Sequence, residues 1–204
     1  MPARFAIERG AWQEAARLEP PQSRFSFTDA IVWYARSLGS ARSGDAAAAE
    51  KSAQTLGETA AALKSAKNDY WAIEVEVQHR AALAWIEFAK GRREEAIAQM
   101  RAAAELEDTS EKSPVSPGRL IPARELLGDM LLESGRAAEA LTKYERAQVR
   151  DPNRLRGLYG AGLAAAQSGD RAKAKVFFAR VVALIGTSDA RPELRKVRDY
   201  LASN

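Results

Sequence analysis

Few residues of this 204-residue chain have the types and spacing that catalysis or metal binding requires. The one histidine, His79, stands in EVQHRAALAW, within a helical pattern. A histidine base needs an oriented partner and a nucleophile within hydrogen-bonding reach, and the sequence designates neither. One imidazole also cannot form a zinc site that needs two. We therefore interpret His79 as a partly buried or surface residue, and enzyme activity would require a deep pocket that holds it beside a carboxylate.

Neighbouring carboxylates are the second set that could do acid–base or metal chemistry. They occur as Glu94-Glu95 and as Glu74 with Glu76. Side chains one or two positions apart on a helix point away from each other, so neither pair shares a site. No phosphate-binding loop is present, because no Lys-Ser or Lys-Thr follows a spaced glycine pair. The chain also has no cysteine, which excludes disulfides and thiolate ligands. The sequence predicts no enzyme, no cofactor and no metal.

Composition and charge indicate an ordinary soluble chain with a basic end. Hydrophobic residues make up 46% and charged residues 28%. Residues 150–204 hold 11 Lys or Arg and 5 Asp or Glu, a net charge of +6, whereas residues 1–149 have a net charge of −2. No apolar run approaches the roughly 18 residues of a membrane helix. The start, MPARFAIERGAW, lacks the apolar core of a secretory signal, so we expect no membrane and a cytoplasmic location for the chain as written.

Helical patterns dominate the chain, and one of them is repeated. ESGRAAEALTKYERA (133–147) and QSGDRAKAKVFFARV (167–181) place glycine, alanine and an aromatic residue at the same offsets. Gly135 and Gly169 are 34 residues apart, the length of a two-helix repeat. The other matching pairs are Gly128 and Gly162, Ala140 and Ala174, Tyr144 and Phe178, and Ala147 and Val181. The pattern predicts paired helices that are closed by glycine turns and packed around small residues.

This pattern resembles the tetratricopeptide repeat family, whose Leu-Gly, Ala, aromatic and Pro signature is matched by Leu127-Gly128, Ala140, Tyr144 and Pro152. The resemblance implies an all-α, right-handed α-solenoid. We predict one domain with hairpins at about 30–63, 77–110, 121–154 and 155–188 and a capping helix at about 189–202. A proline-rich loop is expected at 111–120. IERGAWQEAARLEP resembles the turn and second helix of a further unit, so we expect the C-terminal part of a larger bacterial protein of this family.

The resemblance implies a non-catalytic scaffold or adaptor that binds a peptide or partner helix in a concave groove. The first helix of each hairpin lines that groove in the family. Glu125 and Asp129 beside Arg156 predict a basic or mixed-charge ligand rather than a clamped carboxylate. The alternative is RNA binding through the basic C-terminal quarter, and nucleic acid is the less favoured partner. Carried over by position, the groove residues are Gln78, Trp85, Phe88, Glu125, Asp129, Leu132, Glu133, Arg156, Tyr159, Leu163 and Gln167.

Overall fold

The computed structural model describes residues 2–111, 119–186 and 192–203, which form eleven α-helices and no strand. The all-α prediction is therefore confirmed. Most of the predicted loop, residues 112–118, and the beginning of the predicted capping helix, residues 189–191, lie outside the described residues. The chain divides into two compact units, residues 1–126 and 127–204.

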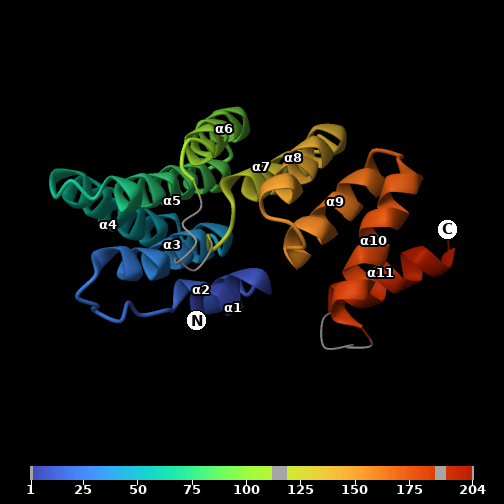
Figure 1. The fold of residues 1–204 in the computed structure, drawn as a ribbon, viewed down its shortest axis with the longest axis horizontal. Helices are drawn as coiled ribbons and strands as arrows, with labels where there is room; N and C mark the ends of the chain where they lie inside the picture. Colours follow the sequence, from blue (N-terminus) through green and yellow to red (C-terminus); the bar gives the residue numbers. More distant parts are fainter. Residues whose placement is uncertain (1, 112–118, 187–191, 204) are drawn as a thin grey trace. The chain divides into compact units, whose positions relative to one another are not determined.

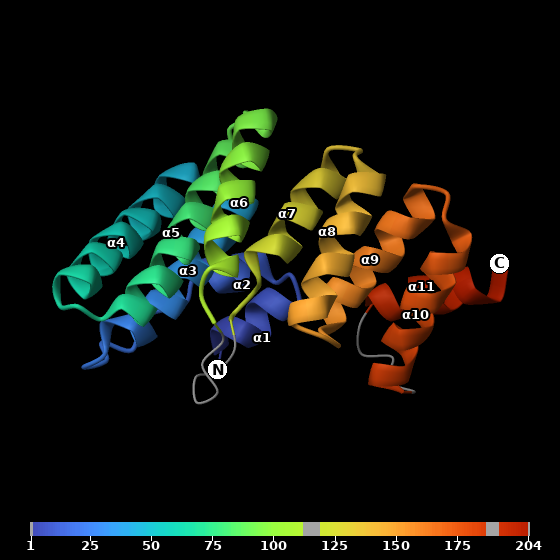
Figure 2. The ribbon, with the colours of Figure 1, turned by 45° about the horizontal axis from the view of Figure 1, so that its top comes forward.

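The first unit is built from helices that pack against their neighbours in chain order. Helix α2 packs on α3, α3 on α4, α4 on α5 and α5 on α6, and α3 also contacts α1 and α5. Figure 2 shows α4, α5 and α6 side by side. The helices are α1 (Pro2–Glu8), α2 (Trp12–Ala16), α3 (Ser26–Arg42), α4 (Ala46–Ser65), α5 (Asp69–Ala89) and α6 (Arg93–Asp108) (Figure 1).

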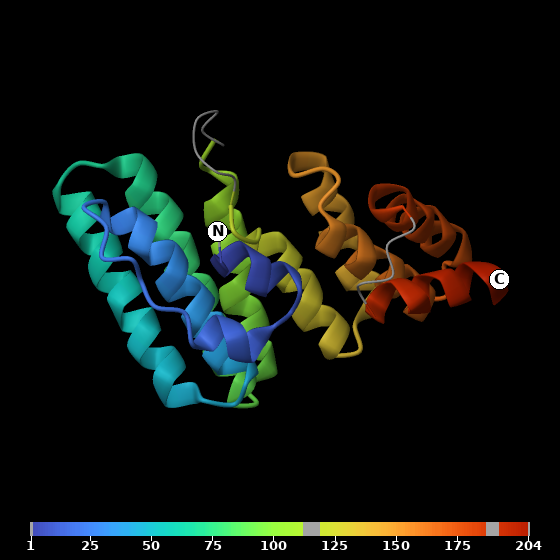
Figure 3. The same cartoon turned by 90° about the horizontal axis from the view of Figure 1, so that it is seen from below.

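The second unit continues the sequential packing. Helix α7 (Ala123–Glu133) begins in the first unit and ends in the second. Helix α8 (Ala137–Arg150) packs on α9 (Leu155–Gln167), and α9 packs on α10 (Arg171–Ile185). The last helix, α11 (Pro192–Ser203), lies against α10 (Figure 3).

Each hairpin is closed by a glycine in the left-handed conformation. The φ angle is +86° at Gly44, +85° at Gly91, +77° at Gly135 and +87° at Gly169. In every case the glycine N–H bonds to the carbonyl three residues earlier, and the next N–H bonds to the carbonyl five residues earlier. A Cβ added at any of these glycines would meet nothing within 4 Å, so the backbone angle, and not a lack of space, favours glycine. Gly10 makes the same two bonds between α1 and α2, which gives a fifth hairpin where the sequence predicted a turn and second helix.

The 34-residue equivalence between hairpins is also present in the core of the second unit. The ring of Tyr144 lies between two helical glycines, since an added Cβ would come 2.8 Å from it at Gly128 and 2.5 Å from it at Gly160. One repeat later, an added Cβ at Gly162 would lie 2.4 Å from Phe178. Glycine is therefore needed where each ring meets a helix backbone, and this packing fixes α7, α8 and α9 at close range.

No helix among the described residues combines the length and the apolar character needed to cross a membrane.

Candidate functional site

Helix α5 has a partly exposed stripe that runs along its whole length. Its other faces are buried against neighbouring helices, with Val75, Ala81 and Trp85 at most 2% exposed. Alternating steps of four and three residues keep the stripe on one side of the helix. It runs from Asp69 to Glu87, and the 18 steps between these residues rise about 27 Å at 1.5 Å per residue. The stripe consists of Asp69, Ile73, Glu76, Arg80, Leu83 and Glu87.

Two adjoining hollows lie over this stripe, and together we call them the α5 trough. The first has a volume of about 540 Å³, and the second has a volume of about 600 Å³. Arg80 lines both hollows, so they are neighbours along α5. The walls of the first are Gly57, Ala60, Ala61 and Lys64 of α4 and Leu106 of α6, and the walls of the second are Arg92, Glu95, Gln99 and Ala102.

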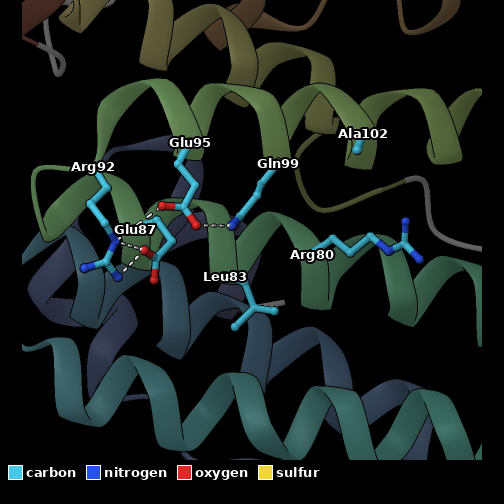
Figure 4. A pocket seen from close by; sticks show the side chains of 7 residues that line it. All are labelled: Arg80, Leu83, Glu87, Arg92, Glu95, Gln99 and Ala102. Carbon is cyan, nitrogen blue, oxygen red and sulfur yellow. Dashed lines mark hydrogen bonds and ion pairs between the residues drawn. The ribbon is translucent and has the colours of Figure 1, made fainter.

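The second hollow has an exposed leucine surrounded by paired charges. Figure 4 shows Leu83 on α5 between Glu87 and Arg80, with Glu95 and Gln99 on α6 above it. Leu83 is 38% exposed, which is unusual for a leucine in a hollow. Arg92 forms ion pairs with Glu87 and Glu95, and the Gln99 amide donates to Glu95 at 3.3 Å. The charged groups at the rim are therefore balanced within the protein, and the apolar surface stays open.

The first hollow contains His79. Its Nδ1 is 3.5 Å from a carboxylate oxygen of Glu76, and Arg80 donates to the other oxygen of Glu76 at 2.6 Å. The ring rests on Gly57, where an added Cβ would lie 2.9 Å from His79 Cε1. The histidine thus lies in a hollow beside a carboxylate, which the sequence did not predict. None of the described residues that line this hollow is Ser, Thr or Cys, so none offers a hydroxyl or thiol nucleophile.

Among the predicted groove residues of the second unit, Asp129 and Arg156 are brought together, so this acidic group is already used. Asp129 accepts a hydrogen bond from the Tyr144 hydroxyl at 2.5 Å and forms an ion pair with Arg156. Glu133 and Gln167 are exposed, and Leu132 and Leu163 are half-buried. Because Arg156 neutralises Asp129, this carboxylate is not available to a basic ligand.

Tyr159, also expected in the groove, faces the last helix. Its ring centroid is 6.3 Å from that of Phe178, and Phe178 packs edge-to-face on Tyr200 of α11. Burial and the nearby carboxylate of Glu193 raise the pKa of Tyr159 above 10.0. Tyr159 is therefore a packing residue at the junction of α9, α10 and α11.

In the first unit, two of the predicted groove residues are buried. Trp85 is 2% exposed and stacks on the Arg42 guanidinium at 4.3 Å, and Glu125 is 0% exposed. Gln78 and Phe88 are half-buried, and the Phe88 ring lies 5.1 Å from that of Trp85. Neither Trp85 nor Glu125 is available to a ligand, so neither residue can line the groove that the resemblance implies.

Sequence reasoning did not identify the α5 trough. The available signal was the stripe with steps of four and three, in which Ile73 and Leu83 alternate with charged residues. Such a stripe also occurs on an ordinary solvated helix face. Within the described ranges no group of three or more His, Cys, Asp or Glu is arranged to hold a metal ion. The chain matches no family model and no curated protein.

Proposed function

We propose that this protein is a non-catalytic protein-interaction module of the tetratricopeptide type, in which the hairpins form a right-handed solenoid and the α5 trough binds a partner helix. The observation that carries the proposal is the trough itself, whose stripe on α5 is about 27 Å long and places Ile73 and Leu83 among paired charges. A helix that lays its apolar side into a groove between helices is a common mode of peptide recognition.

The residues of the trough suit a helix better than a small molecule. Both hollows are open to solvent rather than enclosed, and small side chains such as Ala61 and Ala102 in the walls allow a backbone to approach closely. Ile73 and Leu83 are 10 residues apart, so they lie about 15 Å apart along α5. A partner helix with apolar residues two or three turns apart would contact both.

The paired charges indicate which charges a partner helix would carry on its flanks. Glu76 is held by Arg80, and Glu87 is held by Arg92, so binding need not bury an uncompensated charge. Lys64 and Asp69 also line the first hollow and supply one charge of each sign. A partner with charged residues of both signs on its flanks fits this rim.

The face of α7 and α9 that carries Leu132, Leu163 and Gln167 is a second surface on which the same function can be tested.

The test is selection of peptide ligands followed by binding to matched variants. The full chain selects binders from a displayed library of helical peptides, and their affinities are measured for wild type, L83R and F5R. Leu83 is 38% exposed in the trough and Phe5 is 59% exposed on α1, so neither substitution disturbs the core. We expect L83R to weaken binding at least about tenfold and F5R to change it less than about twofold. Ligands that bind L83R as well as wild type, or a selection that yields no ligand, would overturn the proposal.

A further inference from the structure

Helix α10 has a composition unlike that of the other helices. Its sequence, RAKAKVFFARVVALI, holds four Lys or Arg and no Asp or Glu. Ala174, Phe177, Phe178 and Val181 bury one side of the helix. Val176, on the opposite side, is 59% exposed, and Leu184, near the end of the helix, is 49% exposed. Basic and apolar side chains therefore share the outer surface of this helix.

Two contacts align α8 with α10 on this surface. Lys173 forms an ion pair with Glu145 at 2.7 Å, and Arg180 donates to the side-chain oxygen of Asn153 at 3.1 Å. Val149 lies midway between Glu145 and Asn153 in the sequence, and Val176 lies midway between Lys173 and Arg180. The two valines are therefore at the same level, and Val149 is 85% exposed. We call this surface the cationic face, formed by Glu145, Arg146, Val149, Lys173, Val176, Arg180 and Leu184.

We infer that the cationic face binds an acidic amphipathic helix of another protein, with Asp or Glu flanking a stripe of aliphatic residues. Glu145 balances Lys173 within the face. The complementary charge therefore comes from Arg146 and Arg180 and from the excess of cations in residues 127–204, which contain 14 Lys or Arg and 9 Asp or Glu, a net charge of +5. The three exposed aliphatic side chains form the apolar centre that such a stripe would cover, and the cations form its rim. This site is independent of the α5 trough, which belongs to the first unit.

The same observations disfavour RNA as the occupant. Proteins that bind single-stranded RNA stack bases on exposed aromatic rings as well as neutralising phosphates. The described rings of α8 and α10, those of Tyr144, Phe177 and Phe178, are 1%, 8% and 2% exposed. The exposed groups between the cations are aliphatic, and they match leucine or valine side chains rather than bases.

Binding of three labelled probes to the full chain tests the inference. The probes are a helical peptide with a leucine stripe flanked by Glu, the same peptide with Lys in place of Glu, and a single-stranded RNA. We expect the Glu peptide alone to bind, with an affinity that falls as salt rises. V149E/V176E should weaken this binding at least about tenfold, V149A/V176A should weaken it about threefold, and L83R should leave it unchanged. All variants are compared by circular dichroism and thermal unfolding.

Four outcomes would overturn the inference. Equal binding of the Glu and Lys peptides would show that charge has no role. Binding of the Glu peptide to V149E/V176E with the affinity of wild type would show that the peptide binds elsewhere. RNA that binds more tightly than the Glu peptide, with an affinity unaffected by V149A/V176A, would identify the surface as a phosphate-binding one. Loss of binding by L83R but not by V149E/V176E would assign the ligand to the α5 trough.

Discussion

Arg156 of α9 forms an ion pair with Asp129 of α7 and so joins the first helices of two consecutive hairpins. The side chains are 17% and 12% exposed, and the Tyr144 hydroxyl donates to the other carboxylate oxygen. One repeat later, Leu163 and Phe178 stand at the positions of Asp129 and Tyr144. Apolar residues thus occupy, in one hairpin, the positions that form a polar contact in the hairpin before it.

Removal of the Asp129 carboxylate should therefore be costly, whereas removal of the whole polar set should not. We expect D129A to lower the free energy of unfolding by about 2–3 kcal/mol, because Arg156 and the Tyr144 hydroxyl stay partly buried and lose this acceptor. In the triple variant D129L/Y144F/R156M, the first two substitutions copy the Leu163 and Phe178 of the next repeat and the third removes the cation that would be left. This variant should lose less unfolding free energy than D129A alone. Urea unfolding of both variants measures this. A triple variant that is less stable than D129A would show that the contact is not replaceable by apolar packing.

Gly160 is a second position where a small change should have a large effect. G160A would place a Cβ 2.5 Å from the Tyr144 ring, which Gly128 holds from the other side. We expect a loss of about 1–3 kcal/mol from overpacking, although alanine is favoured over glycine in a helix by about 1 kcal/mol. The control is G57A in α4, where the nearest group is the partly exposed ring of His79, which can move. G57A should be neutral or stabilising in thermal unfolding, and equal losses in both variants would contradict this account.

Arg119 is the centre of a buried ionic network in the first unit. Its guanidinium is 3.0 Å from Glu74 and 3.3 Å from Glu107, and its side chain is 7% exposed. Both oxygens of Glu107 also accept from the Ala123 N–H at the start of α7. We expect R119M to lower the free energy of unfolding by about 3–5 kcal/mol, because two buried carboxylates lose this counter-ion.

The control for Arg119 is an exposed ion pair. Arg9 and Glu14 are 2.8 Å apart with side chains 40% and 48% exposed, so R9M should change stability by less than about 1 kcal/mol. Both variants are compared by chemical denaturation at the same pH and salt. Similar losses for R119M and R9M would mean that burial of the network has no effect on its strength.

Tyr34 predicts a dependence of stability on alkaline pH. Burial, and then the negative charge of Glu107, raise its pKa well above 10.0. In the unfolded chain the phenol ionises near pH 10, whereas in the folded protein it stays protonated. The stabilisation is therefore complete below pH 10 and falls above it, by about 1.4 kcal/mol per pH unit until the folded pKa is reached. The difference in unfolding free energy between wild type and Y34F, measured from pH 8 to 11, should be constant up to pH 10 and then shift in favour of Y34F.

The hairpins could be predicted from the sequence because their determinants are local. Gly44, Gly91, Gly135 and Gly169 each occupy a turn that requires a positive φ, and the same two backbone bonds close each turn. The match of Tyr144 and Phe178 at 34 residues follows from the same logic, since each ring needs a small residue opposite it. Repeated local geometry leaves a repeated sequence pattern, and the all-helical fold follows from it.

The surfaces available to a partner were decided by tertiary structure. Trp85 and Glu125 have the helical positions expected of groove residues, but neighbouring elements bury them. Asp129 carries a charge in the sequence, yet Arg156, 27 residues away, neutralises it. Likewise the pairing of Glu74 with Arg119 spans 45 residues and leaves no periodic trace. The sequence alone determined the turns, helices and packing rings, whereas the exposure of Leu83 and Val149 depended on which helix faces their neighbours leave uncovered.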